Sequence, residues 1–188
     1  MTTSRIANVP NIITTIRLVL SIVVFALIAV DQFLAAMIVF IIAASTDWID
    51  GYWARKYNQV TKVGRVFDPF VDKVIICGTF TFLAAEANSG VLPWMAVVVM
   101  GREMLVTGLR SFIEQAGGDF SASFSGKLKM LLQCIAVGAS LLALHYSVGG
   151  NVPAWLSWTV TISVWIAMLS TVQSGVEYIF AAARYFRE

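Results

Sequence analysis

The chain has 188 residues, of which 59% are hydrophobic and 13% charged, and its formal net charge is +2. Soluble domains average about 45–50% apolar and about 25% charged residues, so this composition indicates a membrane protein and excludes an ordinary soluble domain. The small net charge excludes nucleic-acid binding through a strongly basic surface. At roughly 20 residues per helical span, the length accommodates a single membrane domain of about six helices over residues 1–188.

Six apolar stretches predict an all-α integral membrane protein with six transmembrane helices. Each stretch is long enough, at about 1.5 Å per residue, to cross a hydrocarbon core of about 30 Å. Polar and helix-breaking residues such as Asn88-Ser89-Gly90 separate the stretches. The expected spans cover approximately residues 11–30, 33–54, 69–87, 91–113, 125–146 and 154–180.

The positions of the basic residues predict the orientation of these spans. Every Lys and Arg lies near a terminus or near the second or fourth connection, and the first, third and fifth connections contain none. Cytoplasmic loops of multi-pass proteins carry an excess of Lys and Arg. We therefore expect both termini and the second and fourth connections to lie on the cytoplasmic side.

Four aspartates flank the second connection, namely Asp47, Asp50, Asp68 and Asp72. Asp47 falls about 21 Å along its span and roughly 9 Å inside the inner boundary of the membrane. A charge at the centre of a span costs about 2.5–3.5 kcal/mol on insertion scales, so such residues are usually functional. Spacings of three and four positions place each pair of aspartates on one helical face.

Four clustered carboxylates predict a metal site. Their mutual repulsion would raise some of their pKa values unless divalent cations lie between them. Ligation by oxygen alone favours Mg²⁺ or Mn²⁺. The alternative is a set of interfacial ion pairs with the nearby basic residues Arg55, Lys56, Arg65 and Lys73. Gly51 and Ala54 argue against this alternative, because small residues let a bulky group or a phosphate approach the backbone.

This stretch resembles a known family signature. It matches the pattern of the CDP-alcohol phosphotransferases at all eight fixed positions, which are Asp47, Asp50, Gly51, Ala54, Arg55, Gly64, Asp68 and Asp72. The resemblance implies attack of an alcohol on CDP-diacylglycerol with release of CMP, assisted by two divalent ions. It also implies a homodimer in the inner (cytoplasmic) membrane, with a polar active-site cavity facing the cytoplasm.

The resemblance also implies roles for individual residues. The four aspartates would be metal ligands, and Asp72 would in addition be the base for the acceptor hydroxyl. The CDP group would be bound by Gly51, Ala54, Arg55 and Gly64, with Asn11, Thr14 and Arg17 of the first span completing the nucleotide wall.

Arginines in the fourth span suggest the nature of the acceptor. Arg102 lies about 14 Å along this span, near mid-membrane, and needs an anionic partner. Its neighbour Glu103 points about 100° away on a helix and is not an automatic partner, whereas Arg110 shares its face. Two guanidinium groups suit a phosphate, and Lys127 and Lys129 add charge at the start of the fifth span. The alternative is that these arginines extend to lipid head groups.

Secondary motifs favour one branch of the family. The stretches 102–110, 126–129 and 174–178 are similar to those of phosphatidylglycerophosphate synthases, which implies sn-glycerol 3-phosphate as the acceptor. Inositol phosphate and phosphatidylglycerol remain alternative acceptors. An ion-coupled transporter is the alternative from another functional class, and the absence of an evident repeat between the two halves argues against it.

Overall fold

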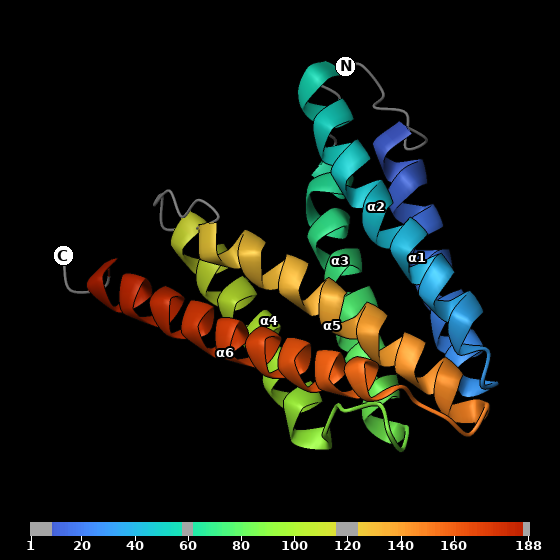
Figure 1. The fold of residues 1–188 in the computed structure, drawn as a ribbon. Helices are drawn as coiled ribbons and strands as arrows, with labels where there is room; N and C mark the ends of the chain where they lie inside the picture. Colours follow the sequence, from blue (N-terminus) through green and yellow to red (C-terminus); the bar gives the residue numbers. More distant parts are fainter. Residues whose placement is uncertain (1–8, 58–61, 116–123, 186–188) are drawn as a thin grey trace.

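The computed structural model describes the backbone of residues 9–57, 62–115 and 124–185. Side chains are described in these ranges except at residues 9–11, 13, 47–57, 62–69, 114 and 124. All regular structure in the described ranges is helical (Figure 1). The helices are α1 (Val9–Ala29), α2 (Phe33–Tyr57), α3 (Lys62–Ala85), α4 (Pro93–Gln115), α5 (Phe124–Val148) and α6 (Ala154–Tyr185).

These helices confirm the predicted all-α fold and the order of its elements. Most boundaries lie within about three residues of the predicted ones, but α3 begins at Lys62, well before the predicted 69. The turns of α3 before Pro69 contain Lys62, Arg65 and Asp68, and they are helical although their sequence is not continuously apolar. Hydropathy therefore located the apolar part of this helix and missed its polar beginning.

Helix α3 lies at the centre of the bundle, in contact with α1, α4 and α5. Helices α5 and α6 pack side by side along their length, as Figure 1 shows, and α4 packs against α6. This arrangement brings α3, α4, α5 and α6 together around one interior volume. Side chains of α3 that face α1 therefore have different neighbours from side chains that face α4.

The three described connections lie at one end of the bundle, which we call the connection end. The α1–α2 turn shares a cavity with the α5–α6 turn, and the α3–α4 turn shares another with it. Gly90 in the α3–α4 turn has φ of 74°, and a Cβ there would lie 2.4 Å from Val160 Cγ1. Glycine is suited both to the left-handed conformation and to the close approach to α6, because it has no Cβ.

The polar and apolar side chains are distributed as expected for a protein in lipid. The large apolar side chains of Val97, Met104 and Phe180 have exposed fractions of 70%, 70% and 69%. Soluble monomers rarely expose large contiguous apolar surfaces. The interior instead contains Arg17 and Gln133, both almost completely buried.

Within the described residues, two helical segments are long and apolar enough to cross a membrane, Ser125–Val148 and Ala154–Tyr185. Thr14–Ala29 of α1 and Phe33–Thr46 of α2 are shorter apolar segments. Helices α3 and α4 carry charged residues within their apolar sequence, which lowers their mean hydropathy. The six-span topology therefore stays a prediction.

Candidate active site

Two polar clusters lie on different sides of α3. Asp72 and Lys73 are consecutive on this helix, so their side chains leave it about 100° apart. Asp72 is hydrogen-bonded to Arg17 of α1. Asp72 thus belongs to the contact between α1 and α3.

The first cluster is an ion pair between α1 and α3. Arg17 Nη1 donates a hydrogen bond of 2.5 Å to Asp72 Oδ1. The Arg17 side chain is 2% exposed, whereas that of Asp72 is 26% exposed. Thr14, also buried, lies almost one turn before Arg17 on α1. The pair neutralises a buried cation and fixes the orientation of a carboxylate that other groups can still reach.

The other signature residues lie outside the described side chains. Their backbone positions place Asp47, Asp50, Gly51, Ala54 and Arg55 in α2, and Gly64 and Asp68 in α3. Asn11 lies in the first turns of α1, and its side chain is likewise not described. Convergence of the four carboxylates on one site therefore stays a prediction.

The donor chemistry at Asp72 is compatible with a hard divalent cation. Its side chain offers oxygen and is partly exposed, as a metal ligand reachable from a cavity must be. No group of three or more His, Cys, Asp or Glu suited to a metal occurs among the described side chains, which include only Asp72 of the four aspartates.

The second cluster joins α4, α5 and α6 through Glu103. Arg102 Nη1 donates to Glu103 Oε1 at 3.1 Å, and Lys129 Nζ donates to the same oxygen. Arg102 Nη2 also donates to Ser174 Oγ of α6 at 2.8 Å. Glu103 thus partners Arg102 despite its position about 100° around the helix, because the long arginine side chain reaches sideways across the helix surface.

Tyr178 of α6 brings the two arginines together. Arg110 Nη2 donates to the Tyr178 hydroxyl at 3.1 Å. The guanidinium carbons of Arg102 and Arg110 lie 5.5 and 5.9 Å from the centre of its ring, within the range of cation–π attraction. The prediction that the two arginines share one face of α4 is confirmed by this common partner.

Gly175 allows α6 to approach α4 at this point. A Cβ on Gly175 would lie 3.2 Å from Arg102 Cγ, closer than ordinary van der Waals contact. Small residues commonly permit such approaches between helices in membranes. Gly175 and Ser174 therefore form the surface on which Arg102 rests.

The two predicted lysines of α5 have different surroundings. Lys129 is buried in the second cluster. Lys127 is exposed and makes no hydrogen bond or ion pair to the described side chains of that cluster. Positions two apart on a helix point about 200° apart, so one face of α5 cannot present both lysines to the cluster. The structure does not bring Lys127 together with the two arginines.

Sequence reasoning missed several members of the second cluster. Helical direction does not make Glu103 an automatic partner of Arg102, and the 174–178 motif gives Ser174 and Tyr178 no individual role at the site; Tyr178, expected at the inner membrane interface, is buried.

The second cluster carries excess positive charge. Arg102 and Lys129 share the carboxylate of Glu103, and Arg110 contacts the same Tyr178 ring as Arg102, so three cations accompany one carboxylate among these described residues. The buried Nε atoms of Arg102 and Arg110 have no hydrogen-bond partner among the described residues. Buried charges of one sign are costly without a counter-charge, so this cluster can bind an anion with several oxygen atoms.

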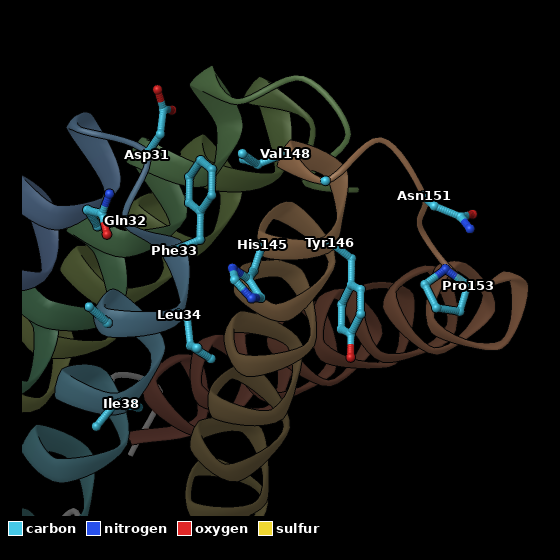
Figure 2. Close-up of a pocket in the computed structure, with 12 residues that line it drawn as sticks. Asp31, Gln32, Phe33, Leu34, Ile38, His145, Tyr146, Val148, Asn151 and Pro153 are labelled. Atoms are coloured by element: carbon cyan, nitrogen blue, oxygen red, sulfur yellow. The ribbon is translucent and has the colours of Figure 1, made fainter.

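A cavity of about 890 Å³ at the connection end has different chemistry. Figure 2 shows His145 and Tyr146 of α5 beside Phe33 and Leu34 of α2, with Asp31 in the adjoining turn. Its lining contains no Arg or Lys. Volume alone therefore does not identify the reactive site, and we place the candidate active site at the two clusters beside α3.

Comparison with known proteins identifies the family of the chain. The family model for CDP-alcohol phosphatidyltransferase matches residues 7–173. A Bacillus subtilis (strain 168) protein named CDP-diacylglycerol–glycerol-3-phosphate 3-phosphatidyltransferase is 38% identical, over 91% of this chain and 93% of that protein. Proteins of the same name from Rickettsia typhi and Escherichia coli K12 are 34% and 29% identical. The alignments cover 95% and 93% of this chain and 99% and 94% of those proteins.

A solved structure has the same fold. The crystal structure of Mycobacterium tuberculosis phosphatidylinositol phosphate synthase with CDP-DAG bound matches with a TM-score of 0.63. The match covers 95% of this chain and 88% of that one at 17% sequence identity. With the family model covering most of the sequence, the chain belongs to the CDP-alcohol phosphatidyltransferase family.

Proposed function

We propose that this protein transfers the phosphatidyl group of CDP-diacylglycerol to sn-glycerol 3-phosphate, giving phosphatidylglycerophosphate and CMP. The observation that carries this choice of acceptor is the excess of positive charge around Arg102, Arg110 and Lys129. The names of relatives that align over nearly their whole length support the same reaction.

The reaction exchanges one phosphorus–oxygen bond for another. A hydroxyl oxygen of the acceptor attacks the phosphorus that bears diacylglycerol, and the bond from this phosphorus to the CMP oxygen breaks. We assign the hydroxyl proton to the carboxylate of Asp72. Arg17 holds this carboxylate in place through the 2.5 Å bond across the α1–α3 contact. Orientation of a base by a second charged group is a common feature of proton transfer sites.

We propose that two Mg²⁺ or Mn²⁺ ions are bound by Asp47, Asp50, Asp68 and Asp72. Such ions, when bound, neutralise phosphate charge and increase the reactivity of the phosphorus. The nucleotide would contact Gly51, Ala54, Arg55 and Gly64, with Asn11 and Thr14 on the α1 side. The eight-position signature and the part-exposed oxygen donor at Asp72 support this proposal.

The phosphate of the acceptor would bind Arg102, Arg110 and Lys129. Arginine can donate two hydrogen bonds to one phosphate, which fixes orientation as well as charge. Tyr178 and Ser174 hold the two guanidiniums before the ligand arrives, so less conformational entropy is lost on binding. An acceptor without a phosphate would leave the cluster's charge uncompensated.

We further propose a homodimer with six spans per chain in the inner membrane, with both termini and the active site on the cytoplasmic side. The distribution of Lys and Arg supports this orientation. In intact spheroplasts, an Asn151→Cys variant should react with a membrane-impermeant maleimide. Failure to label the folded variant would contradict the orientation, and mass measurement in detergent tests the dimer.

Release of CMP by the purified protein tests the function. The assay contains CDP-diacylglycerol and Mg²⁺ with glycerol 3-phosphate, inositol phosphate, glycerol or phosphatidylglycerol, and an EDTA control. We expect release only with metal and glycerol 3-phosphate. Release with another acceptor would retain the family chemistry and reject this acceptor, whereas no release from folded protein with any acceptor would favour a transporter.

A further inference from the structure

A carboxylate lies among the cations that we propose bind the phosphate of the acceptor. Glu103 Oε1 accepts a hydrogen bond from Arg102 Nη1 at 3.1 Å and another from Lys129 Nζ. A carboxylate repels a phosphate, and the repulsion is stronger where little water screens it. Glu103 therefore opposes the binding of a bare phosphate by these cations. A phosphate ester that carries a hydrogen-bond donor beside its phosphate offers this carboxylate a favourable contact.

The two oxygen atoms of this carboxylate have different surroundings. Both hydrogen bonds end on Oε1. Oε2 accepts none from the described side chains, and it is not fully buried, unlike the Nε atoms of Arg102 and Arg110. The Glu103 side chain as a whole is 10% exposed. Because an ionised carboxylate can only accept hydrogen bonds, Oε2 is available to a ligand that donates one.

The bonds to Oε1 also fix the position of Oε2. Arg102 of α4 is bonded at the same time to Ser174 of α6 at 2.8 Å, and Lys129 comes from α5. The carboxylate cannot turn without breaking one of these charged hydrogen bonds. A group held in this way binds a ligand with little further loss of side-chain entropy. A phosphate that contacts Arg102 and Lys129 lies beside Glu103, because both cations are bonded to that carboxylate.

The chemistry of the acceptor matches this arrangement. In sn-glycerol 3-phosphate, a secondary hydroxyl lies on the carbon next to the one that bears the phosphate, and the primary hydroxyl lies one carbon further. We propose that Glu103 Oε2 accepts a hydrogen bond from this secondary hydroxyl. The inference rests on the proposed function and names a residue that selects the acceptor. The cations then contact the phosphate, Glu103 the secondary hydroxyl, and Asp72 the attacking primary hydroxyl.

Three separate contacts also select the configuration of the acceptor. The mirror image, sn-glycerol 1-phosphate, directs its secondary hydroxyl away from Glu103 when its phosphate and primary hydroxyl occupy the same positions. A second analogue, 3-hydroxypropyl phosphate, lacks this hydroxyl. A site built to bind a substrate hydroxyl rejects an analogue without it, because the polar group of the site is then left unpaired. Glu103 therefore favours sn-glycerol 3-phosphate over both analogues.

The test compares these three acceptors in the wild type, in Glu103→Gln and in Glu86→Gln. In Glu103→Gln the two cations retain the amide oxygen, so the amide nitrogen replaces Oε2 and donates where Oε2 accepted. Glu86, in the α3–α4 turn at the connection end, is the matched control for loss of a glutamate charge. CMP release gives kcat/KM for each acceptor and the inhibition constant of inorganic phosphate. Thermal unfolding in detergent with each acceptor reports folding and binding without turnover.

We expect the wild type to favour sn-glycerol 3-phosphate over each analogue by about tenfold or more in kcat/KM, as loss of a hydrogen bond to a charged group produces. In Glu103→Gln both preferences should fall below about threefold, whereas Glu86→Gln should keep them. The inhibition constant of inorganic phosphate should stay unchanged or decrease in Glu103→Gln, because a negative charge beside the phosphate is lost. A purely structural role would raise this constant and leave the preferences unchanged.

Three results would overturn the inference: equal kcat/KM of the wild type for sn-glycerol 3-phosphate and 3-hydroxypropyl phosphate, undiminished preferences in folded Glu103→Gln, or a phosphate inhibition constant that rises in this variant as much as the acceptor KM. The first result decides even where Glu103→Gln does not fold.

Failure of the proposed function gives a different result, because the wild type then releases no CMP with glycerol 3-phosphate. Thermal unfolding still tests the contact in that case. Stronger stabilisation of the wild type by sn-glycerol 3-phosphate than by 3-hydroxypropyl phosphate, lost in Glu103→Gln, would support it, and equal stabilisation by the two acceptors would reject it.

Discussion

The clusters on the two sides of α3 differ in charge balance. Between α1 and α3, the cation of Arg17 is paired with the carboxylate of Asp72. Between α4, α5 and α6, the described cations Arg102, Arg110 and Lys129 accompany one described carboxylate, that of Glu103. Buried charges are stable only when compensated. The first cluster therefore fixes the orientation of a carboxylate, whereas the second has more described positive than negative charge, as an anion site requires.

The largest expected effect follows from removing the negative charge of Asp72 in the first cluster. Asp72→Asn should lower kcat by at least about 100-fold, because the variant lacks the proposed base. Measurement of CMP release checks this. Asp31→Asn is a matched control, since Asp31 lies in the α1–α2 turn with φ of 59°, a conformation that asparagine also adopts. Near-normal kcat in Asp72→Asn would remove Asp72 from the chemistry.

The next largest effect is expected in the second cluster, which we propose binds the phosphate of the acceptor. Arg102→Gln removes a cation bonded to Glu103 and Ser174. A charge-assisted hydrogen bond contributes about 1.5–3 kcal/mol, so the KM for glycerol 3-phosphate should rise about 10- to 150-fold. The KM for CDP-diacylglycerol, measured in the same preparations, should change little. A larger change in the KM for CDP-diacylglycerol than in the KM for glycerol 3-phosphate would contradict separate roles for the two clusters.

A smaller effect is expected where α6 supports Arg102. Gly175→Ala places a Cβ 3.2 Å from Arg102 Cγ, so the arginine must shift by a few tenths of an ångström. We expect a severalfold rise in acceptor KM with little change in thermal stability. Gly138→Ala is the control, because a Cβ there meets no atom within 4 Å. Equal behaviour of the two variants would show that Arg102 tolerates displacement.

The smallest effect is expected at the connection end. His145→Ala changes a residue of the 890 Å³ cavity, which contains neither cluster. Both KM values and kcat should stay within about twofold of the wild type in the CMP-release assay. A selective loss of activity in the folded variant would move part of the active site to this cavity.

Much of the fold could be predicted because hydrophobic length and helical periodicity are local properties. The order of the six helices and the shared face of Arg102 and Arg110 followed from these properties. The bond between Arg17 and Asp72 depends on how α1 packs against α3, which no spacing within one helix reveals. For the same reason, Tyr178 could not be recognised as the common partner of two arginines.

Side-chain length explains the remaining differences. Backbone direction argued against a contact between Arg102 and Glu103, but the arginine side chain is long enough to span the angle between them. Lys127 and Lys129 are close in sequence, yet only Lys129 is buried in the cluster. Helical geometry alone separates the two lysines, so this distinction was available from the sequence.

The most direct test of the division at α3 compares Arg17→Gln with Arg110→Gln against both substrates. If the two clusters have separate roles, Arg17→Gln lowers kcat or raises the KM for CDP-diacylglycerol and leaves the acceptor KM nearly unchanged. Arg110→Gln does the reverse and raises the KM for glycerol 3-phosphate alone. Equal changes towards both substrates in both folded variants, or the opposite pattern, would contradict the account.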